Sequence, residues 1–462
     1  MRIRKLAVIA AAGLASVSCV GFTGDKLDSN PNSPLSATLD QSFVATQGIM
    51  FSLLSSDLAM FQNVIMQQLS GNGRQWISYD TYDQPEDFQS IGSFYVSGGL
   101  IDIRKAQATA RAGGYKQYLG VLQVWEALVM GVAADTYGDI AYSQALKPTP
   151  IPAPSALDPQ QQVYASLQLL LDSAIINLPG GGAILPGSKD LVYGGSVTKW
   201  TKLAHTLKAR LYLHTAEKIP GAYALALAQA KLGISSSADD FLTYQSSTVG
   251  EQNRWYEFKQ GRSDDVAAGR TMVELMRARG DPRLPLWIDV NASGDIRGQY
   301  PYTTPRPGEE TDPSWLTDLI AGQTAQMPIV TWAETKLIEA EAAYRTADEP
   351  GARAALNAVR TDATLAPVAI TVTGPALFTA IMEEKYVDTF RTLESWNDYK
   401  RTCYPNITPS GGKTNVLARL PYGSQERSTN PNVPALGAQP ARNWNDPVTT
   451  TSTDGTACKG QK

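Results

Sequence analysis

Residues 329–360, IVTWAETKLIEAEAAYRTADEPGARAALNAVR, predict two helices joined by a short polar connection. Apolar residues recur every three to four positions in each half, which is the spacing of one face of an α-helix. Small side chains at Ala333, Ala340 and Ala343 would let the two helices approach closely. The stretch therefore predicts a tightly packed pair of helices.

The same pattern recurs along the chain. Residues 197–217 and 223–232 form a second candidate pair, and further helices are predicted over 37–69, 115–137, 163–178, 267–279 and 377–396. Paired helices with small residues at their crossing are typical of tetratricopeptide (TPR) repeats, although the period here is irregular. We predict a mainly α fold, an irregular TPR-like framework of helical pairs. Long loop excursions rich in Pro and Gly are expected over 147–159, 179–187, 291–314 and most of 403–462.

The N-terminus, MRIRKLAVIAAAGLASVSC, has a positively charged start, a short apolar run and small residues before Cys19. This pattern predicts a signal peptide over residues 1–18, because the apolar run is too short to span a membrane. A cysteine directly after the cut predicts lipidation of Cys19, and ordinary secretion is the alternative. Residues 19–35 then form a polar tether, and residues 36–462 form one helical body. We expect no other segment long and apolar enough to cross a membrane.

The net charge bears on the class of ligand, and the two remaining cysteines bear on a disulfide. The formal net charge is −4, with scattered Lys and Arg, which disfavours nucleic-acid binding because phosphate contacts need clustered positive charge. In an oxidising compartment Cys403 and Cys458 could form a disulfide, and two free thiols are the alternative.

No catalytic or metal-binding motif stands out. The only histidines, His205 and His214, are nine residues apart on one predicted helix. They therefore point to opposite faces and cannot share a metal, so we interpret them as two isolated helix residues. The sequence has no His-Glu-x-x-His, Cys-x-x-Cys, Gly-x-Ser-x-Gly or glycine-rich phosphate-loop motif. We predict no enzyme, no metal and no cofactor.

Acidic residues occur in groups that could serve as catalytic carboxylates or as calcium ligands. Glu334 and Glu341 lie on one predicted helix, and Glu383 and Glu384 lie on another. Glycosidases need two carboxylates, usually from separate elements, so we interpret these pairs as solvated charges or salt-bridge partners. A possible calcium patch comprises Asp80, Asp83, Glu86 and Asp87. It lacks the spacing and the turn glycine of an EF-hand.

Aromatic residues with polar neighbours gather in two segments. The candidate ligand-binding residues are Trp76, Tyr79 and Tyr82 in the first segment, and Asn253, Trp255 and Tyr256 in the second. Rings beside amide and hydroxyl groups suit the stacking of sugar faces. The alternative is that these rings fill the core between irregular loops.

Several segments, in order, resemble the SusD/RagB family of surface lipoproteins. They are the tether DKLDSNPNSPLSAT (25–38), WEALVMGVAADTYGDIAYSQAL (125–146), WTKLAHTLKARLYLHTA (200–216), DPRLPLWI (281–288), TWAETKLIEAEAAYR (331–345), EEKYVDTFRTLESWNDYKRTCYP (383–405) and NWND (443–446). Within them Tyr137-Gly138-Asp139 ends a helix and turns the chain, and Asp281-Pro282 starts a turn, so the motifs mark the fold and not a reaction. Arg283 and Arg401, within them, are predicted to pair with acids or carbonyls.

The resemblance implies an outer-membrane, surface-exposed lipoprotein that lies as a lid on a SusC-like TonB-dependent transporter. Such a protein captures oligosaccharides, or in some members peptides, and delivers them to the barrel without breaking a bond. Two alternatives remain open. One is a secreted helical glycosidase, and the other is a TPR-like protein-interaction scaffold without a small ligand.

Overall fold

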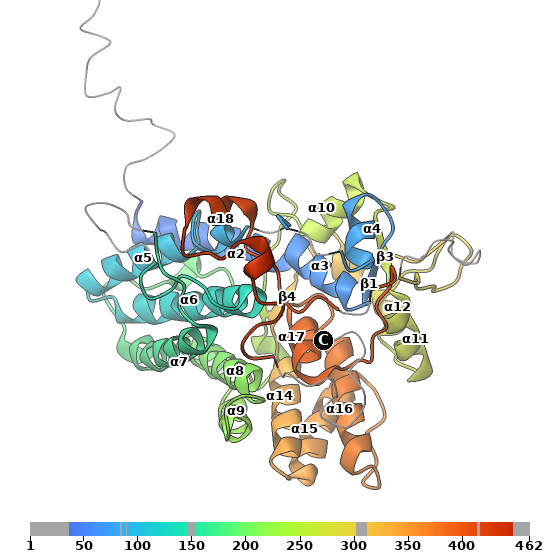
Figure 1. Cartoon of the computed structure of the whole chain (residues 1–462). Helices are drawn as coiled ribbons and strands as arrows, with labels where there is room; N and C mark the ends of the chain where they lie inside the picture. The colour runs from blue at the N-terminus through green and yellow to red at the C-terminus, as the bar shows by residue number, and fades with distance from the viewer. Residues whose placement is uncertain are drawn as a thin grey trace, which may run out of the picture.

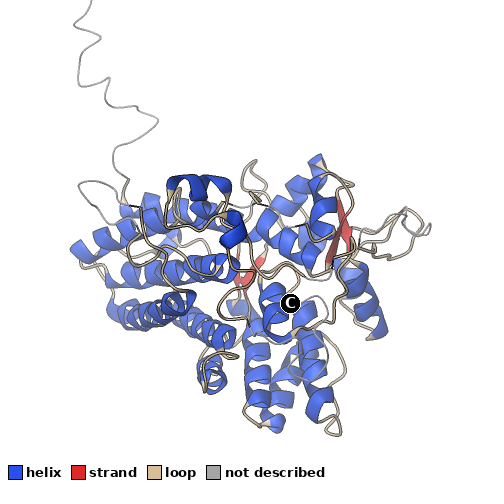
Figure 2. Cartoon of the chain, viewed as in Figure 1, coloured by secondary structure: helices blue, strands red, loops and turns tan. Residues whose placement is uncertain are grey.

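The computed structural model describes residues 37–83, 86–88, 90–145, 154–301, 312–413 and 416–446. Helices dominate these residues, and the few strands are short (Figures 1 and 2). The α-helices are α2 (Leu39–Ser55), α3 (Asp57–Ile65), α4 (Gln75–Asp80), α5 (Leu100–Ala112), α6 (Lys116–Tyr137), α7 (Gln160–Asn177), α8 (Val197–Thr215), α9 (Ala222–Ala230), α10 (Arg254–Gly261), α11 (Arg270–Ala278), α12 (Leu284–Trp287), α13 (Asp318–Ala321), α14 (Trp332–Arg345), α15 (Glu349–Asp362), α16 (Gly374–Asp388), α17 (Glu394–Thr402) and α18 (Ser424–Thr429). The predicted mainly α class is confirmed.

Two small antiparallel sheets tie distant segments together (Figure 2). β1 (Leu69–Gly71) pairs with β3 (Val266–Ala268), and β2 (Phe241–Leu242) pairs with β4 (Pro328–Val330). Leu69 lies opposite Ala268 in the first sheet. Each sheet therefore fixes a loop-rich segment against an element that is distant in the sequence.

The framework consists of helices that pack on their chain neighbours. α5, α6, α7, α8 and α9 follow one another across one side of the molecule, and α14, α15 and α16 stand beside α8 and α9 in the lower middle of the view (Figure 1). In the α14–α15 pair, Ala340 and Ala343 are buried against Ala352 and Ala355. Small residues do lie where the two helices cross, so the TPR-like framework is confirmed.

The longest helix, α6, ends as the sequence predicts. Gly138 follows its last residue with a φ of +80°, a backbone conformation that favours glycine. A Cβ at this position would lie 2.7 Å from Oδ1 of Asn443. The chain turn after α6 and the approach of the C-terminal segment therefore both require glycine here.

Three predicted helices have different boundaries. The helix predicted over 377–396 is split into α16 and α17, because Arg391 between them adopts a φ of +67°. The helix predicted over 37–69 is split into α2 and α3 at Ser56 and gives way to β1. The first residues of the helix predicted over 267–279 belong to β3. The helices predicted from the sequence include none of α4, α5, α10, α12, α13 and α18.

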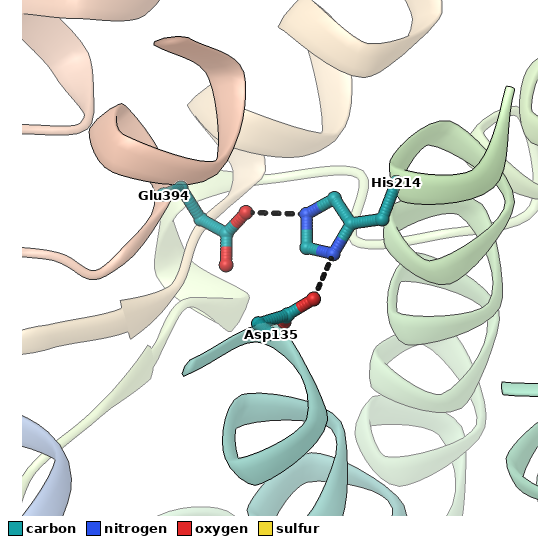
Figure 3. Close-up of side chains that lie close together, drawn as sticks. All are labelled: Asp135, His214 and Glu394. Atoms are coloured by element: carbon teal, nitrogen blue, oxygen red, sulfur yellow. Dashed lines mark hydrogen bonds and ion pairs between the residues drawn. The ribbon is translucent and has the colours of Figure 1, made fainter. Parts of the chain in front are cut away.

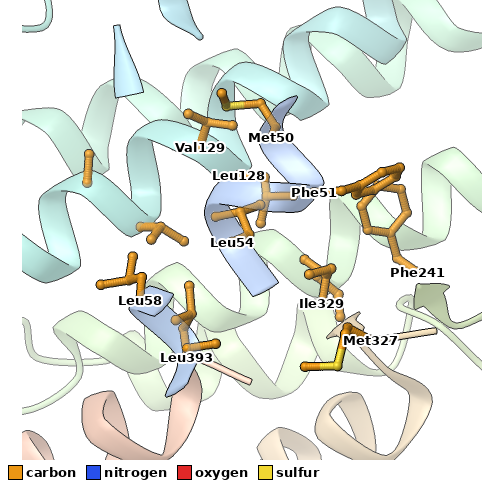
Figure 4. Close-up of a cluster of buried hydrophobic side chains, with 14 of the residues drawn as sticks. Met50, Phe51, Leu54, Leu58, Leu128, Val129, Phe241, Met327, Ile329 and Leu393 are labelled. Carbon is orange, nitrogen blue, oxygen red and sulfur yellow. The ribbon is translucent and has the colours of Figure 1, made fainter. Parts of the chain in front are cut away.

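A large hydrophobic core joins most of the elements, and two smaller clusters hold α9, α14 and α15. Figure 4 shows part of the large core, where Met50, Phe51 and Leu54 of α2 meet Leu128 and Val129 of α6. The other labelled side chains of that view are Leu58, Phe241, Met327, Ile329 and Leu393. Residues from Leu39 to Val433 belong to this cluster. Both small sheets are therefore anchored in the core that α2 and α6 build.

Two helical stretches are long and apolar enough to cross a membrane, so our expectation of none beyond the signal peptide is wrong. They are Leu39–Ile65 and Lys116–Tyr137. The most apolar window of Lys116–Tyr137 is 100% buried within the fold, and that of Leu39–Ile65 is 56% buried. Helices at the centre of a large core reach the same hydropathy, which accounts for both stretches.

The predicted signal peptide, Cys19 and the tether lie outside the described residues. So does Cys458. Cys403 is buried directly after α17 and is disulfide-bonded. The pairing of Cys403 with Cys458 stays a prediction.

Candidate ligand-binding site

Four of the six predicted ligand-binding residues are core residues. Trp76, Tyr82, Asn253 and Trp255 expose 3% of their surface or less. They cannot offer a face to a ligand at the surface, because neighbouring side chains cover them. Of the six, only Tyr79 and Tyr256 are half-buried.

Local contacts explain why these side chains turn inward. Asn253 is the N-cap of α10, where its Oδ1 accepts hydrogen bonds from the backbone N–H groups of Trp255 (2.8 Å) and Tyr256 (3.2 Å). The ring of Trp76 packs edge-on against Tyr79 and Phe258, at 5.4 Å in each case. The two predicted segments therefore meet, but they meet as packed interior between α4 and α10.

A surface hollow of about 460 Å³ lies beside this packed interior. We call it the Trp315 hollow and define it by Asn72, Lys259, Asp264, Gln299 and Trp315. Asn72 precedes α4, and Lys259 belongs to α10. Residues that directly adjoin the two predicted segments thus line the hollow, and the six predicted residues do not. Trp315 directly follows the predicted loop over 291–314.

The Trp315 hollow combines one aromatic ring with donors and acceptors. The Lys259 ammonium lies 5.1 Å from the centroid of the Trp315 ring and donates to the Ser263 carbonyl at 2.7 Å. Burial lowers the pKa of Lys259 from its ordinary value. An amphipathic ligand with an apolar face and a hydroxylated edge fits this chemistry.

The possible calcium patch does not converge on one point. Asp80 is buried and accepts from the backbone N–H of Gly71 at 3.0 Å. Asp83 pairs with Lys413, Glu86 with Arg427, and Asp87 accepts from Ser424. Each carboxylate serves a different neighbour.

One group of side chains with metal-ligating chemistry occurs among the described residues, and it is buried (Figure 3). Nδ1 of His214 on α8 lies 2.9 Å from Oδ1 of Asp135 on α6, and Nε2 lies 2.8 Å from Oε2 of Glu394 on α17. Burial alone would lower the pKa of His214, but the two carboxylates outweigh it and raise that pKa to about 9. His214 is therefore a buried imidazolium between two acids, and our interpretation of it as an isolated residue is wrong.

The residues around this cluster do not fit a metal ion. The imidazole uses both ring nitrogens on the two carboxylates, so neither nitrogen is left to face an ion. Arg210 lies 3.4 Å from Glu394, and Lys400 donates to the backbone carbonyl of Asp135. Protein cations already balance the acids, and we assign the cluster to the structure of the fold.

Glu334, Glu341 and Glu384 are buried salt-bridge partners, which is one of the two interpretations of the helical carboxylate pairs, and Glu383 is half-buried. Glu334 is bonded to Arg210 at 2.6 Å, and Glu341 is bonded to Arg401 and Lys385. Glu384 contacts Arg279, Arg283 and Arg360. The predicted pairing of Arg283 and Arg401 with acids is confirmed.

Residues 31–422 match a family model, SusD-like, that is described as starch-binding and associating with the outer membrane. The chain belongs to the SusD-like family. The resemblance to SusD/RagB proteins noted in the sequence is thereby confirmed.

Solved structures share the SusD-like fold at low identity. A chitin-binding SusD homologue from Flavobacterium johnsoniae has a TM-score of 0.75 and 18% identity, and covers 89% of this chain and 99% of its own. A SusD/RagB family protein from Bacteroides thetaiotaomicron has a TM-score of 0.69 and 18% identity, with the same two coverages. None of the curated proteins matches the chain.

Proposed function

We propose that this SusD-like chain binds a neutral oligosaccharide in the Trp315 hollow. The observation that carries the proposal is that a chain of this family has one aromatic ring, Trp315, set among amide, carboxylate and ammonium groups at its surface. A sugar presents an apolar C–H face to such a ring and hydroxyl groups to its polar neighbours. The starch-binding description of the family and the chitin-binding neighbour support this ligand class.

The binding step is followed by delivery. A lipid on Cys19 holds the chain at the outer face of the outer membrane, and the chain hands its ligand to a SusC-like TonB-dependent transporter. The family's association with the outer membrane and the predicted signal peptide support this part. Replacing Cys19 with Ala should release the chain from the membrane, and purification from outer membranes should recover a large TonB-dependent barrel with the wild-type chain.

Calorimetric titration of the mature chain with chitohexaose and maltohexaose tests the binding site. We expect one of the two sugars to bind and Trp315→Ala to weaken it by about tenfold or more, which is about 1.4 kcal/mol. Tyr212→Ala is a matched control, because Tyr212 is also half-buried below a lysine, Lys208, at 6.0 Å. Binding of neither sugar, or equal loss in both variants, contradicts the proposal.

Product analysis of the same mixtures tests the glycosidase alternative. Asp264 and Asp312 both line the Trp315 hollow. The Asp312 carboxylate accepts from the backbone N–H groups of Ala292 and Ser293, so it holds a turn. We expect no cleavage of either hexaose. Cleavage that Asp264→Asn abolishes would replace binding and delivery with hydrolysis.

A further inference from the structure

A second and larger hollow lies next to the start of α10. It has a volume of about 810 Å³, within the range of roughly 300–1,000 Å³ that is common for ligand sites. We call it the Tyr244 hollow and define it by Ile49 and Ser52 of α2, Val96 before α5, and Tyr244 and Arg254. No sequence prediction and no step of the proposed delivery uses these residues.

The loop that carries Tyr244 is fixed without a ligand. The backbone N–H of Ser246 donates to the Glu251 carbonyl at 3.0 Å, and its hydroxyl donates to the Glu251 carboxylate at 2.6 Å. The backbone N–H of Glu251 in turn donates to the Thr248 carbonyl at 2.9 Å. Binding here would therefore cost little ordering of the loop, which favours affinity.

The lining of the Tyr244 hollow is amphipathic and contains one cation, Arg254, and one anion, Glu251. Ile49, Val96 and Tyr244 expose 41%, 51% and 42% of their surfaces, an unusual gathering of exposed apolar groups around one hollow. Serine hydroxyls stand among them, and these both donate and accept hydrogen bonds, as sugar hydroxyls do. Arg254 is paired with Glu257, and the Glu251 carboxylate is bonded to Ser246. This lining matches a neutral, hydroxylated ligand better than a charged one.

Helix α10 contributes one lining residue to each of the two hollows. Arg254, at its first residue, reaches Ser52 of α2 at 3.2 Å and lines the Tyr244 hollow. Lys259 lines the Trp315 hollow five residues later, about 7–8 Å further along the helix axis. Phe258, the residue before Lys259, packs on Trp76 of α4 and anchors α10 against α4.

We propose that the Tyr244 hollow is a second site for neutral oligosaccharide, which engages a separate stretch of the same long glycan that the Trp315 hollow binds. The inference rests on the proposed function. Two linked contacts raise the affinity for a long chain above that for a short one, because the second contact forms at a high effective concentration. The chain then retains polysaccharide better than short fragments.

The test titrates the mature chain with the hexaose that binds and with its soluble polymer, either glycol chitin or amylopectin. We expect Tyr244→Ala to weaken polymer binding by about 2- to 10-fold and to remove one of two hexaose sites per chain. Tyr244→Phe should retain both, because the ring remains. Hexaose binding should persist in Trp315→Ala at one site and disappear in the double variant.

The possible failures are distinguishable. If Tyr244→Ala matches the wild-type chain for hexaose and polymer while Trp315→Ala loses all binding, the second site is wrong and the proposed function stands. If the wild-type chain binds neither glycan series, both proposals fall. A short peptide that binds and is lost in Tyr244→Ala, with no glycan competing, overturns the assignment of the ligand class. Circular dichroism of each variant checks that the fold is unchanged.

Discussion

Nε2 of His214 lies 2.8 Å from the carboxylate of Glu394, although 180 residues separate the two in the chain. Around this contact the segments that resemble the SusD/RagB family come together. Asn443 donates to the Asp135 carbonyl at 2.7 Å, and Asn445 donates to the His214 carbonyl at 3.1 Å. The segments 125–146, 200–216, 383–405 and 443–446 therefore share one buried junction. Their joint occurrence marks the fold because these residues hold α6, α8, α17 and the C-terminal segment together.

The buried imidazolium makes stability depend on pH. Because the pKa of His214 rises from 6.5 to about 9 on folding, its contribution is fully present below about pH 6.5 and is lost as pH rises through 9. Burial raises the pKa of Asp240 and of Asp388 to about 7, so most of their titration lies below the pH range in which His214 loses its proton. Urea unfolding should show a loss on the order of 2 kcal/mol between about pH 7.5 and 9.5.

The second histidine supplies the control for this titration. His205 is bonded to Gln229 and lies outside the junction. His205→Gln should keep the pH dependence, and His214→Gln should flatten it at a lower overall stability. If His214→Gln does not fold, the pH at which the His214 imidazole of the wild-type chain titrates by NMR decides the matter. A titration near pH 6.5 contradicts the assignment.

Breaking a buried ion pair should lower the free energy of unfolding far more than breaking an exposed one. Glu341 is fully buried and accepts from Lys385 at 2.7 Å and from Arg401, so Glu341→Gln leaves two cations with one acid too few. We expect a loss of about 3–5 kcal/mol in the free energy of unfolding. The exposed pair of Glu274 with Arg277 gives the control, where Glu274→Gln should cost about 0.5 kcal/mol or less. Similar losses of unfolding free energy in the two variants would contradict the assignment of Glu341 to a buried ion pair.

The turn after α6 predicts a glycine-specific effect. Gly138→Ala must adopt a φ of +80° and place its Cβ against Asn443, whose amide is held by the Asp135 carbonyl. We expect a loss of about 2 kcal/mol or more. Gly114→Ala has a φ of +69° but open space around the new Cβ, so it should cost about 1 kcal/mol. Equal melting temperatures for the two variants would show that Asn443 moves aside.

The helical framework could be predicted from the sequence because helix periodicity is local. The pairs 197–217 with 223–232 and 329–345 with 351–360 agree with α8–α9 and α14–α15 to within a few residues at each end. The signal for α5 was also present, since Leu100, Ile103, Ala106 and Ala110 keep helical spacing and are buried. The break at Arg391 had no such signal, because a positive φ at a non-glycine residue is imposed by tertiary contacts.

The site was harder to predict because exposure is a tertiary property. Composition brought attention to Trp76 and Trp255, and both belong to the segments beside the Trp315 hollow. Trp76 packs on Phe258 and Trp255 packs on Phe390, and no local pattern in the sequence reveals these contacts. The partners of His214 lie 79 and 180 positions away in the chain, so a local sequence pattern could not predict the junction either.

Substitution of Trp76 and of Trp315 should separate packing from binding. Trp76 is 1% exposed and packs edge-on with two rings, so Trp76→Ala should cost about 3–5 kcal/mol of stability by leaving a cavity. Trp315 is half-buried, so Trp315→Ala should lose less stability and far more glycan affinity. Urea unfolding and calorimetric titration of both variants measure the two effects. Trp76→Phe keeps most of the buried ring and should retain hexaose affinity at reduced stability. If Trp76→Phe unfolds at the wild-type urea concentration yet binds the hexaose as poorly as Trp315→Ala, then Trp76 contacts the ligand directly and the interior of α4 and α10 opens to admit it.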